Sequence, residues 1–290
     1  MKLIISNFTD INIFHFFSLE INAIWKEIHT NPSDYSIYLT NYKDDVVNRW
    51  RYNFISKLVN KVFIDANINT DINKDIYTEH INLKCTDWMY DSWQFINYQP
   101  ANYYISIADL VKTNMNISIQ KTGTDIVFVI RTSSRVLYDY ETNTLLETVL
   151  LKHIPELKIV DFDKLTFEEQ VKTISNAKLM ISCHGAANTN AIFLPPNGKL
   201  IEISFRNHWY CDPVCNDHAT GKIKYTDKCC GKLTFRQFYH KADYHNICKI
   251  FNKDYAEIPL SNAEGFINEN PINIRKIWVD SQKIIDQLSS

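Results

Sequence analysis

The stretch "MISCHGAANTNAIFLPPNGKLIEI", residues 180–203, contains two of the six glycines in this chain of 290 residues. An apolar run ends at His184, a run of small residues follows, and a second apolar run closes the stretch. Short apolar runs on either side of a small-residue segment predict two buried strands joined through a short helix. We therefore expect a tight turn at Gly185 and Ala186, where the first strand passes into that helix.

Similar strand-and-helix units surround this stretch. The pattern predicts strands at 125–131, 157–162, 178–182 and 199–204, and helices at 141–152, 166–176 and 186–193. Thr166 and Glu169 stand three residues apart at the start of one helix, which is the spacing of a capping box. Because strands and helices alternate, we expect a parallel sheet with helices on both faces.

The first part of the chain alternates in the same way. The pattern predicts strands at 2–6, 35–40 and 61–66 and helices at 14–29, 45–59 and 105–114, whereas residues 67–102 show no regular period. We therefore expect an α/β fold with one domain over residues 1–118 and a second over residues 119–270. A final helix is expected over residues 271–290, because Pro271 is a favoured first-turn residue.

The composition is that of an ordinary globular protein, with 45% hydrophobic and 22% charged residues. The formal net charge of −2 is not that of a polycation, so we expect no nucleic-acid partner. The apolar run that begins at Leu3 is too short for a signal peptide, and no stretch approaches the roughly 18 apolar residues of a membrane span. We therefore expect a soluble, cytoplasmic protein without a membrane span.

Ligands of parallel α/β sheets bind at the carboxyl ends of the strands. In this chain that rule selects Arg131, Asp161, Glu202 and residues 183–186. Gly185 and Ala186 open a helix, whose free N–H groups and dipole favour an anion, and the preceding His184 adds a hydrogen-bond donor. The alternative is a turn with no ligand and a histidine that belongs to the core.

Charged side chains strengthen the anion hypothesis. Arg131 and Arg135 follow the first strand of the second half, and arginine forms bidentate pairs with phosphate oxygens. Both could instead be surface residues with carboxylate partners. Glu202 is expected at a strand end, where an acid can accept hydrogen bonds from a ribose, or where it is simply solvated.

These residues carry a resemblance to a known family. The run "ISNAKLMISCHGAANTNAIFLPPNGKLIEI" resembles the signature of glycosyltransferase family 61, which includes EGF-domain O-GlcNAc transferases, the O-mannose-linked GlcNAc transferase and plant xylan xylosyl- and arabinosyltransferases. The matching positions are His184, Gly185, Ala186, Thr189, Asn190, Ala191, Phe193, Leu194, Pro195 and Glu202. Arg131 and Arg135 match the arginine pair of the family, whereas Asp139 stands where asparagine is usual. Residues 241–258 resemble the distal aromatic segment of the family.

The N-terminal part resembles the family in one short segment. In "INIFHFF", residues 11–17, Asn12 and His15 fit the family pattern. The acid of that pattern falls on Leu19, with Glu20 beside it. His15 and Glu20 are therefore our candidates for the catalytic base.

The resemblance implies a GT-B fold, in which two Rossmann-like domains face a cleft, with the acceptor side on residues 1–118 and the nucleotide-sugar donor on residues 119–270. It also implies inverting transfer of a sugar from a nucleotide-diphosphate donor, with UDP as the expected nucleotide, to a hydroxyl of a glycan or protein acceptor. We assign donor binding to Arg131, Arg135, His184, Gly185, Ala186, Asn188 and Glu202. The alternative is a non-catalytic homologue that binds a glycan or nucleotide, which the missing acid at Leu19 motivates. A nucleotide-sugar epimerase would need a Gly-x-Gly-x-x-Gly motif, and the chain has none.

Two patterns could hold a metal. Asp161 and Asp163 form an Asp-x-Asp motif, which three residues match easily by chance, and we expect neither manganese nor magnesium as a required cofactor. The sulfur-rich segment contains Cys211, Cys215, Cys229 and Cys230. Its spacing is not that of a regular zinc finger, so we expect no structural zinc, and disulfides or reduced thiols remain the alternatives.

Overall fold

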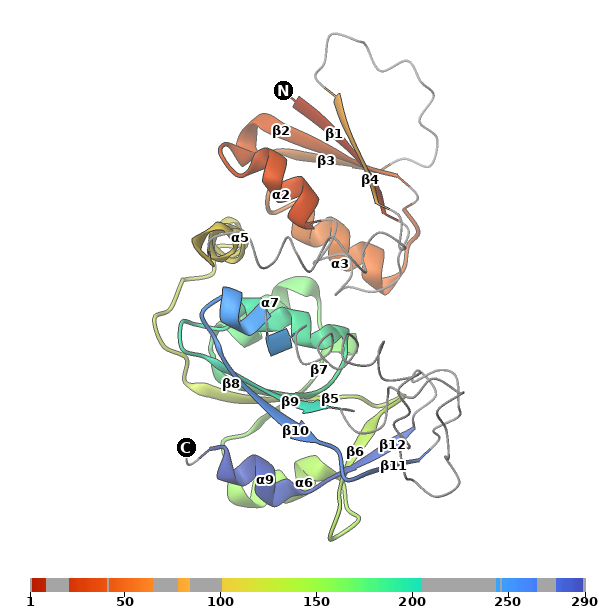
Figure 1. Cartoon of the computed structure of the whole chain (residues 1–290), viewed down its shortest axis with the longest axis vertical. Helices are drawn as coiled ribbons and strands as arrows, with labels where there is room; N and C mark the ends of the chain where they lie inside the picture. Colours follow the sequence, from red (N-terminus) through yellow and green to blue (C-terminus); the bar gives the residue numbers. More distant parts are fainter. Residues whose placement is uncertain are drawn as a thin grey trace, which may run out of the picture. The chain divides into compact units, whose positions relative to one another are not determined.

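The structure is a computed structural model, and it describes residues 2–8, 21–40, 42–64, 78–83, 101–204, 244–245, 247–264 and 275–288 (Figure 1). The chain divides into two compact units. The first consists of Met1–Ile119 with Thr166–Lys172, and the second of Gln120–Leu165 with Thr173–Ser290. Each unit has its own parallel sheet, which confirms the predicted α/β class.

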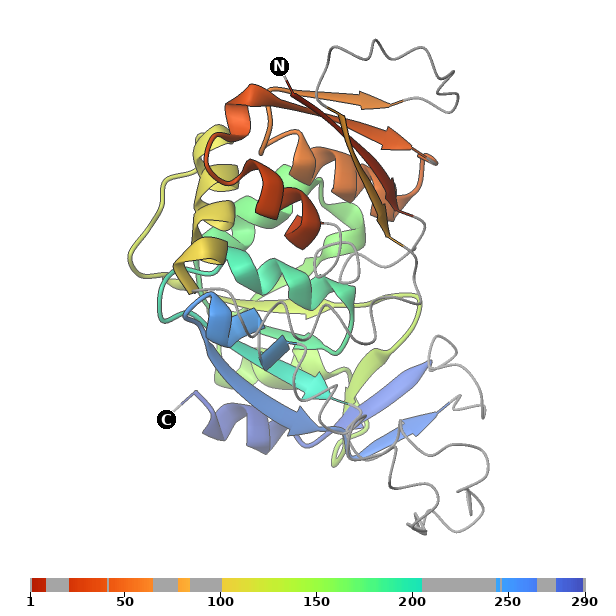
Figure 2. The same cartoon turned by 45° about the horizontal axis from the view of Figure 1, so that its top comes forward.

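The sheet of the first unit has the order β3-β2-β1-β4, and all neighbouring strands are parallel. Its strands are β1 (Lys2–Phe8), β2 (Tyr35–Thr40), β3 (Lys61–Ile64) and β4 (Thr78–Leu83). The helices are α2 (Asn22–Ile28), η2 (Pro32–Asp34), α3 (Val46–Ile55) and α5 (Ala101–Asn114). Figures 1 and 2 both show α2 and α3 on the same side of this sheet.

The helices of the first unit form where the sequence has a helical period. Ile21, Ile24 and Ile28 recur at helical spacing and are fully buried. Helix α3 begins after Asp45, whose Oδ1 accepts a hydrogen bond from the Asn48 main-chain N–H at 2.8 Å. Helices therefore form within the predicted ranges 14–29 and 45–59. Part of the range 14–29 lies outside the described residues.

The sheet of the second unit has the order β10-β9-β8-β5-β7, again with parallel neighbours. Its strands are β5 (Asp125–Ile130), β7 (Lys158–Asp161), β8 (Ala177–Cys183), β9 (Lys199–Ser204) and β10 (Asp254–Pro259). Along the chain its strands are connected by α6 (Leu146–His153), η4 (Phe162–Lys164), α7 (Phe167–Ser175) and η5 (Ala186–Phe193), of which α7 lies mostly in the segment that belongs to the first unit. The central strands are buried on both faces, as their continuous apolar runs predict.

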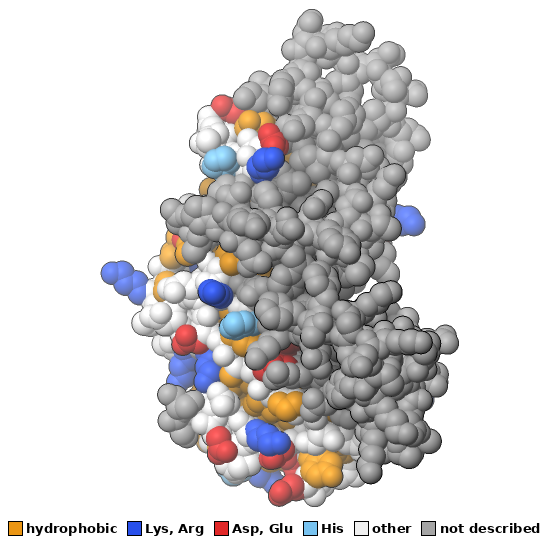
Figure 3. Space-filling model, in the orientation of Figure 1, with side chains coloured by type: hydrophobic (Ala, Val, Ile, Leu, Met, Phe, Trp, Pro, Cys, Tyr) orange, Lys and Arg blue, Asp and Glu red, His pale blue; other side chains and the backbone are white. Residues whose placement is uncertain are grey.

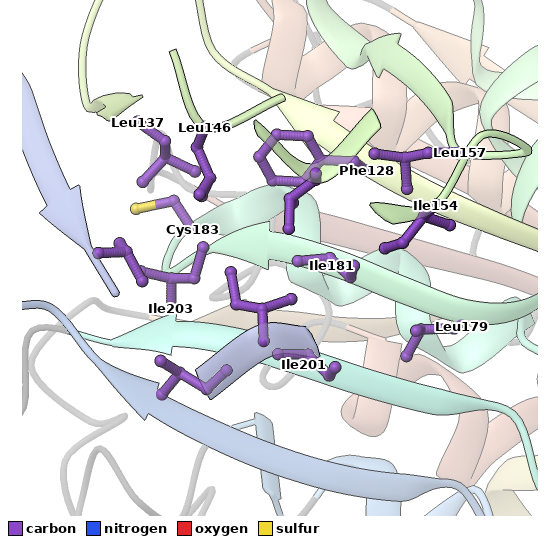
Figure 4. Close-up of a cluster of buried hydrophobic side chains, with 14 of the residues drawn as sticks. Phe128, Leu137, Leu146, Ile154, Leu157, Leu179, Ile181, Cys183, Ile201 and Ile203 are labelled. Atoms are coloured by element: carbon purple, nitrogen blue, oxygen red, sulfur yellow. The ribbon is translucent and has the colours of Figure 1, made fainter. Parts of the chain in front are cut away.

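One face of this sheet carries a cluster of buried hydrophobic side chains, which forms a hydrophobic core of the second unit (Figure 4). Phe128, Ile181 and Ile201 of three neighbouring strands point into it and are fully buried. Leu150 of α6 and Ile284 of α9 (Ser281–Asp286) cover them, in agreement with the place of both helices in Figure 1. The opposite face of β8 and β9 carries the polar side chains described below.

A small sheet with the order β11-β12-β6 was not predicted. It consists of β11 (Asn262–Glu264), β12 (Lys276–Val279) and β6 (Val136–Asp139). The predicted final helix is therefore wrong over residues 276–279, because the buried Ile277 and Val279 alternate with partly exposed neighbours and their strand pairs with β6. The helix that does form, α9, begins only after Asp280, whose Oδ1 accepts from the Gln282 main-chain N–H at 3.1 Å.

The surface of the described residues is mixed in charge. On the face drawn in Figure 3, acidic and basic side chains are interspersed over the described part. None of the helices within the described ranges is both long and apolar enough to cross a membrane.

Candidate anion-binding site

The turn after β8 lies where the sequence predicted a ligand site. Strand β8 ends at Cys183, next to the carboxyl ends of β5 and β9 in the parallel sheet. Residues 184–187 are partly exposed, whereas the residues on both sides of them are buried. The turn is therefore the part of this strand-and-helix unit that a ligand can reach.

Two arginine side chains converge on this turn. A Cβ atom added to Gly185 would lie 2.9 Å from Nη1 of Arg131 and 3.1 Å from Nη1 of Arg135. The two Nη1 atoms are therefore no more than about 6 Å apart, the sum of these distances. Like charges at such a separation repel each other, so this arrangement favours an anion between them or beside them. The absence of a Cβ at Gly185 leaves room for both guanidinium groups at these positions.

The two arginines differ in their fixed contacts. Nη1 of Arg135 donates a hydrogen bond to the main-chain oxygen of His184 at 2.6 Å, and the side chain is buried. Arg135 has a φ of 57°, in the left-handed region that a side chain with a Cβ rarely adopts. Nη2 of Arg131 donates to Oγ of Ser134 at 3.4 Å, and within the described residues Arg131 forms no ion pair with a carboxylate. Arg131 therefore has donors that a ligand can use.

The helix that follows the turn adds main-chain donors. The first hydrogen bond of η5 runs from the Asn188 N–H to the Gly185 oxygen at 2.9 Å. The N–H groups of Ala186 and Ala187 precede this bond and, like the first N–H groups of any helix, have no partner inside the helix. They directly follow Gly185, the residue on which the guanidinium groups converge, and the positive end of the helix dipole adds to the same field.

His184 is held on several sides. Its Nδ1 is hydrogen-bonded to Oε1 of Glu202, and its main-chain N–H donates to the Ile203 oxygen at 2.8 Å. The ring of Tyr244 packs edge-to-face against the imidazole with ring centroids 5.4 Å apart. The Tyr244 hydroxyl also donates to the Gly185 oxygen at 2.7 Å. Tyr244 was not predicted as a site residue, and the only sequence signal for it was the aromatic segment at 241–258.

Glu202 takes a different place from the one the sequence suggested. It lies two residues before the end of β9 and is 1% exposed, so it is not a solvated strand end. Its Oε1 is bonded to His184, and its Oε2 accepts a hydrogen bond from the Tyr255 hydroxyl at 2.7 Å. Both carboxylate oxygens are therefore directed to side chains of the protein and not to a ribose.

The family of the chain follows from a comparison with known protein families. The family described as Glycosyltransferase 61 matches residues 15–201, which is more than half of the 290 residues. The chain belongs to glycosyltransferase family 61. This confirms the resemblance found in the sequence, and the match includes both arginines and the whole turn after β8. No curated protein matches the chain. As a member of this family, the chain is a glycosyltransferase that acts on a sugar donor and an acceptor.

Two more predicted positions of this glycosyltransferase lie below the site and not on its surface. Asn188 is fully buried, and its Oδ1 accepts a hydrogen bond from Oγ of Ser182. Its Oδ1 is therefore directed to β8, and its assignment to donor binding stays a prediction. Cys183 is 3% exposed and packs in the hydrophobic core. Burial raises the pKa of its thiol to about 12, although the nearby Arg135 and Arg131 act in the opposite direction.

Asp161 is also engaged within the glycosyltransferase. Its Oδ1 accepts from the Asp163 main-chain N–H at 3.1 Å, which caps the short helix η4. Its Oδ2 forms an ion pair with Lys164 at 3.2 Å. The structure thus gives the first acid of the Asp-x-Asp motif a helix-capping role.

Six predicted residues of this family 61 chain lie outside the described residues, namely His15, Glu20, Cys211, Cys215, Cys229 and Cys230. The assignment of a catalytic base to the N-terminal part therefore stays a prediction, and so does the state of the cysteine segment.

Proposed function

We propose that this glycosyltransferase is an inverting enzyme that transfers a sugar from a nucleotide-diphosphate donor, with UDP as the nucleotide, to a hydroxyl of a glycan or protein acceptor. The observation that carries the proposal is the convergence of the Arg131 and Arg135 guanidinium groups on Gly185, at the start of η5. Two cationic groups beside two main-chain N–H groups suit a pair of linked phosphates. His184 stands next to them in the same turn.

The proposed reaction is a single displacement at the anomeric carbon of the sugar. The acceptor oxygen forms a bond to this carbon while the bond to the diphosphate oxygen breaks, and attack from the opposite side inverts the configuration. The electron pair of the broken bond leaves with the diphosphate, whose added negative charge Arg131, Arg135 and the N–H groups of η5 would stabilise. The proton of the acceptor hydroxyl goes to a base, for which His15 and Glu20 are the candidates.

The domain roles are part of the same proposal. The residues proposed to bind the donor all belong to the second unit, and the family resemblance assigns the acceptor side to the first. The GT-B arrangement, with two Rossmann-like domains across a cleft, belongs to this proposal as well. We propose no required metal, because guanidinium groups and main-chain N–H groups can together stabilise the leaving diphosphate.

A thermal-shift screen against UDP, GDP and CMP, each with and without manganese, tests the donor site. We expect UDP to raise the melting temperature, because a ligand that binds only the folded state stabilises it, by about 2.7 kcal/mol at a concentration of 100 Kd. No shift with any nucleotide would contradict the donor site. A shift that requires manganese would contradict the metal-free proposal.

Turnover distinguishes the enzyme from a binding homologue. The protein is incubated with UDP-sugars and a panel of glycan and peptide acceptors, and released UDP is measured. Binding of UDP without release of UDP in the presence of any acceptor would favour the non-catalytic alternative. The anomeric configuration of the product, read by NMR, tests inversion, and a product with the configuration of the donor would refute it.

A further inference from the structure

Three side chains from separate parts of the second unit form one hydrogen-bonded chain behind the turn. The Tyr255 hydroxyl of β10 donates to Oε2 of Glu202 in β9, and Oε1 of Glu202 is bonded to Nδ1 of His184. Tyr255 is partly buried, Glu202 is 1% exposed, and the His184 side chain is 13% exposed. The series of hydrogen bonds therefore runs from the interior to the partly exposed His184 in the turn.

The position of Glu202 is unfavourable for a residue that serves packing alone. A buried carboxylate loses its hydration, and an uncompensated charge in the interior destabilises the fold. Glu257 of β10 stands directly opposite Glu202 in the register of the two strands, so two acids are neighbours on one face of the sheet. The nearby Leu200 shows that an apolar residue fits on the same face of β9, because it is fully buried there. The presence of a carboxylate at this buried position therefore indicates that Glu202 has a role that depends on its hydrogen-bond partners.

The hydrogen bonds of Glu202 determine the orientation of its carboxylate group. Burial and then the charge of Glu202 raise the pKa of the Tyr255 phenol, so the hydroxyl keeps its proton and remains a donor. Since this donor occupies Oε2, the other oxygen of the carboxylate is directed to the imidazole. The ring of Tyr244 packs edge-to-face against the same imidazole and adds a second contact to it.

We propose that Glu202 and Tyr255 are positioning residues that hold the His184 imidazole with Nδ1 directed inward and its Nε2 edge directed to the phosphate bound beside Arg131. This inference rests on the proposed function, because the phosphate belongs to the proposed donor. Nε2 lies on the ring edge away from Nδ1, and the His184 side chain as a whole is 13% exposed. When both nitrogens carry hydrogen, the ring donates to Glu202 on one side and to a phosphate oxygen on the other.

The test compares Glu202→Gln and Tyr255→Phe with a matched control, Ser204→Ala. The control removes the Ser204 hydroxyl, which donates a hydrogen bond to Oε1 of Glu257 at 2.7 Å. Tyr255→Phe removes a hydrogen bond of the same length, and both bonds join β9 and β10. Calorimetry measures the affinity of each folded variant for UDP and for uridine, which lacks the phosphates. A variant that merely weakens the fold would change both affinities together.

We expect Glu202→Gln to weaken UDP binding by roughly tenfold and Tyr255→Phe by a smaller factor, with uridine binding unchanged in both. Ser204→Ala should bind UDP as the parent does. If Glu202→Gln does not fold, the UDP affinity of Tyr255→Phe tests the positioning role, because this variant removes one hydroxyl and keeps the carboxylate. UDP and uridine affinities equal to those of the parent in the folded variants would overturn the proposal.

Nitrogen-15 NMR of the imidazole gives a readout that needs no nucleotide. The chain has nine histidines, and the His184→Gln spectrum identifies the signals of His184. In the neutral ring of the parent we expect the hydrogen on Nδ1, and in Glu202→Gln a mixture of both tautomers. Unchanged His184 signals in Glu202→Gln would show that Glu202 does not position the ring.

Calorimetry and NMR together distinguish an error in the positioning role of Glu202 from an error in the proposed donor site. A parent protein that binds no UDP, but in which the His184 signals respond to Glu202→Gln, would contradict the donor site and the phosphate contact, while the ring would still be positioned by Glu202. A parent that binds UDP, with an affinity that neither variant changes, would leave the donor site intact and overturn the positioning role.

Discussion

Arg135 donates a hydrogen bond from Nη1 to the main-chain oxygen of His184 over 2.6 Å. The next carbonyl along the chain, that of Gly185, accepts from the Tyr244 hydroxyl at 2.7 Å. Two successive carbonyls of the turn are therefore fixed by side chains, and the N–H groups that follow them are held in place before a ligand arrives. Donors that are oriented in advance stabilise a negative charge without the free-energy cost of reorganisation.

Replacement of Arg131 by alanine should weaken UDP binding by more than about 1.5 kcal/mol, the scale of a hydrogen bond to a charged group. This corresponds to a loss of affinity of about tenfold. The stability should change little, because the Arg131 contact to Ser134 is long, at 3.4 Å. Calorimetric titration with UDP measures the effect. Arg49→Ala is the control, since Arg49 is an exposed arginine with a 3.5 Å contact to Asp44. Equal affinity in Arg131→Ala and the control would remove Arg131 from the site.

Gly185→Ala should separate the guanidinium groups from the turn. The new Cβ would lie 2.9 Å from Nη1 of Arg131, so this side chain must shift, and we expect UDP affinity to fall by roughly tenfold. The Gly185 φ of 158° also strains an alanine, so the free energy of unfolding should fall by more than about 1 kcal/mol.

Gly198→Ala provides the matched control for this substitution. Its Cβ would lie 2.9 Å from Cβ of Leu194, at the amino end of β9 and away from the arginines. We expect it to lower stability and to leave the UDP affinity of the folded protein unchanged. If Gly198→Ala weakens UDP binding as much as Gly185→Ala does, the effect is not specific to the arginines.

Asp139 should make stability depend on pH in the acid range. Burial raises the pKa of its carboxyl group, but hydrogen bonds from Ser281 and Thr142 outweigh this effect and bring the pKa below the ordinary value of 3.8. A lowered pKa in the folded state gives stability that is fully present above the pKa of the unfolded chain. That stability is lost as the pH falls through the pKa of the folded state.

The measurement for Asp139 is urea unfolding between pH 7 and pH 3. We expect Asp139→Asn to be less stable than the parent by about 1–2 kcal/mol at pH 7, because the amide group cannot accept the bonds from Thr142 and Ser281 together. The difference should narrow below about pH 4. Asp286→Asn, at an exposed position, serves as the control. A difference that stays constant over the whole pH range would contradict the assignment.

Cys183 and Cys248 should resist alkylation in the folded protein. Both thiols are buried, and burial raises the pKa of each, to about 12 for Cys183. With N-ethylmaleimide at pH 7.5, peptide mass spectrometry should find both unmodified in buffer and both modified in urea. Rapid labelling of either cysteine in buffer would show that the core around it opens readily.

Local sequence patterns predicted most elements between residues 125 and 204. The capping box is confirmed, since the Thr166 N–H donates to Oε2 of Glu169 at 2.8 Å and the Glu169 N–H donates to Oγ1 of Thr166 at 3.3 Å. Strand β6 was missed because it has only four residues and pairs with β12, which lies far along the chain. The final helix was predicted too long for the same reason, since pairing with β6 makes residues 276–279 a strand.

Residue type and local period were enough to predict the family, the alternation of strands and helices, and the positions of arginine and glycine at strand ends. The role of Glu202, by contrast, depends on contacts between distant parts of the chain. Its partners His184 and Tyr255 are 18 and 53 residues away along the chain. They meet Glu202 because β8, β9 and β10 are neighbours in one parallel sheet, and such long-range pairing leaves no period in the sequence.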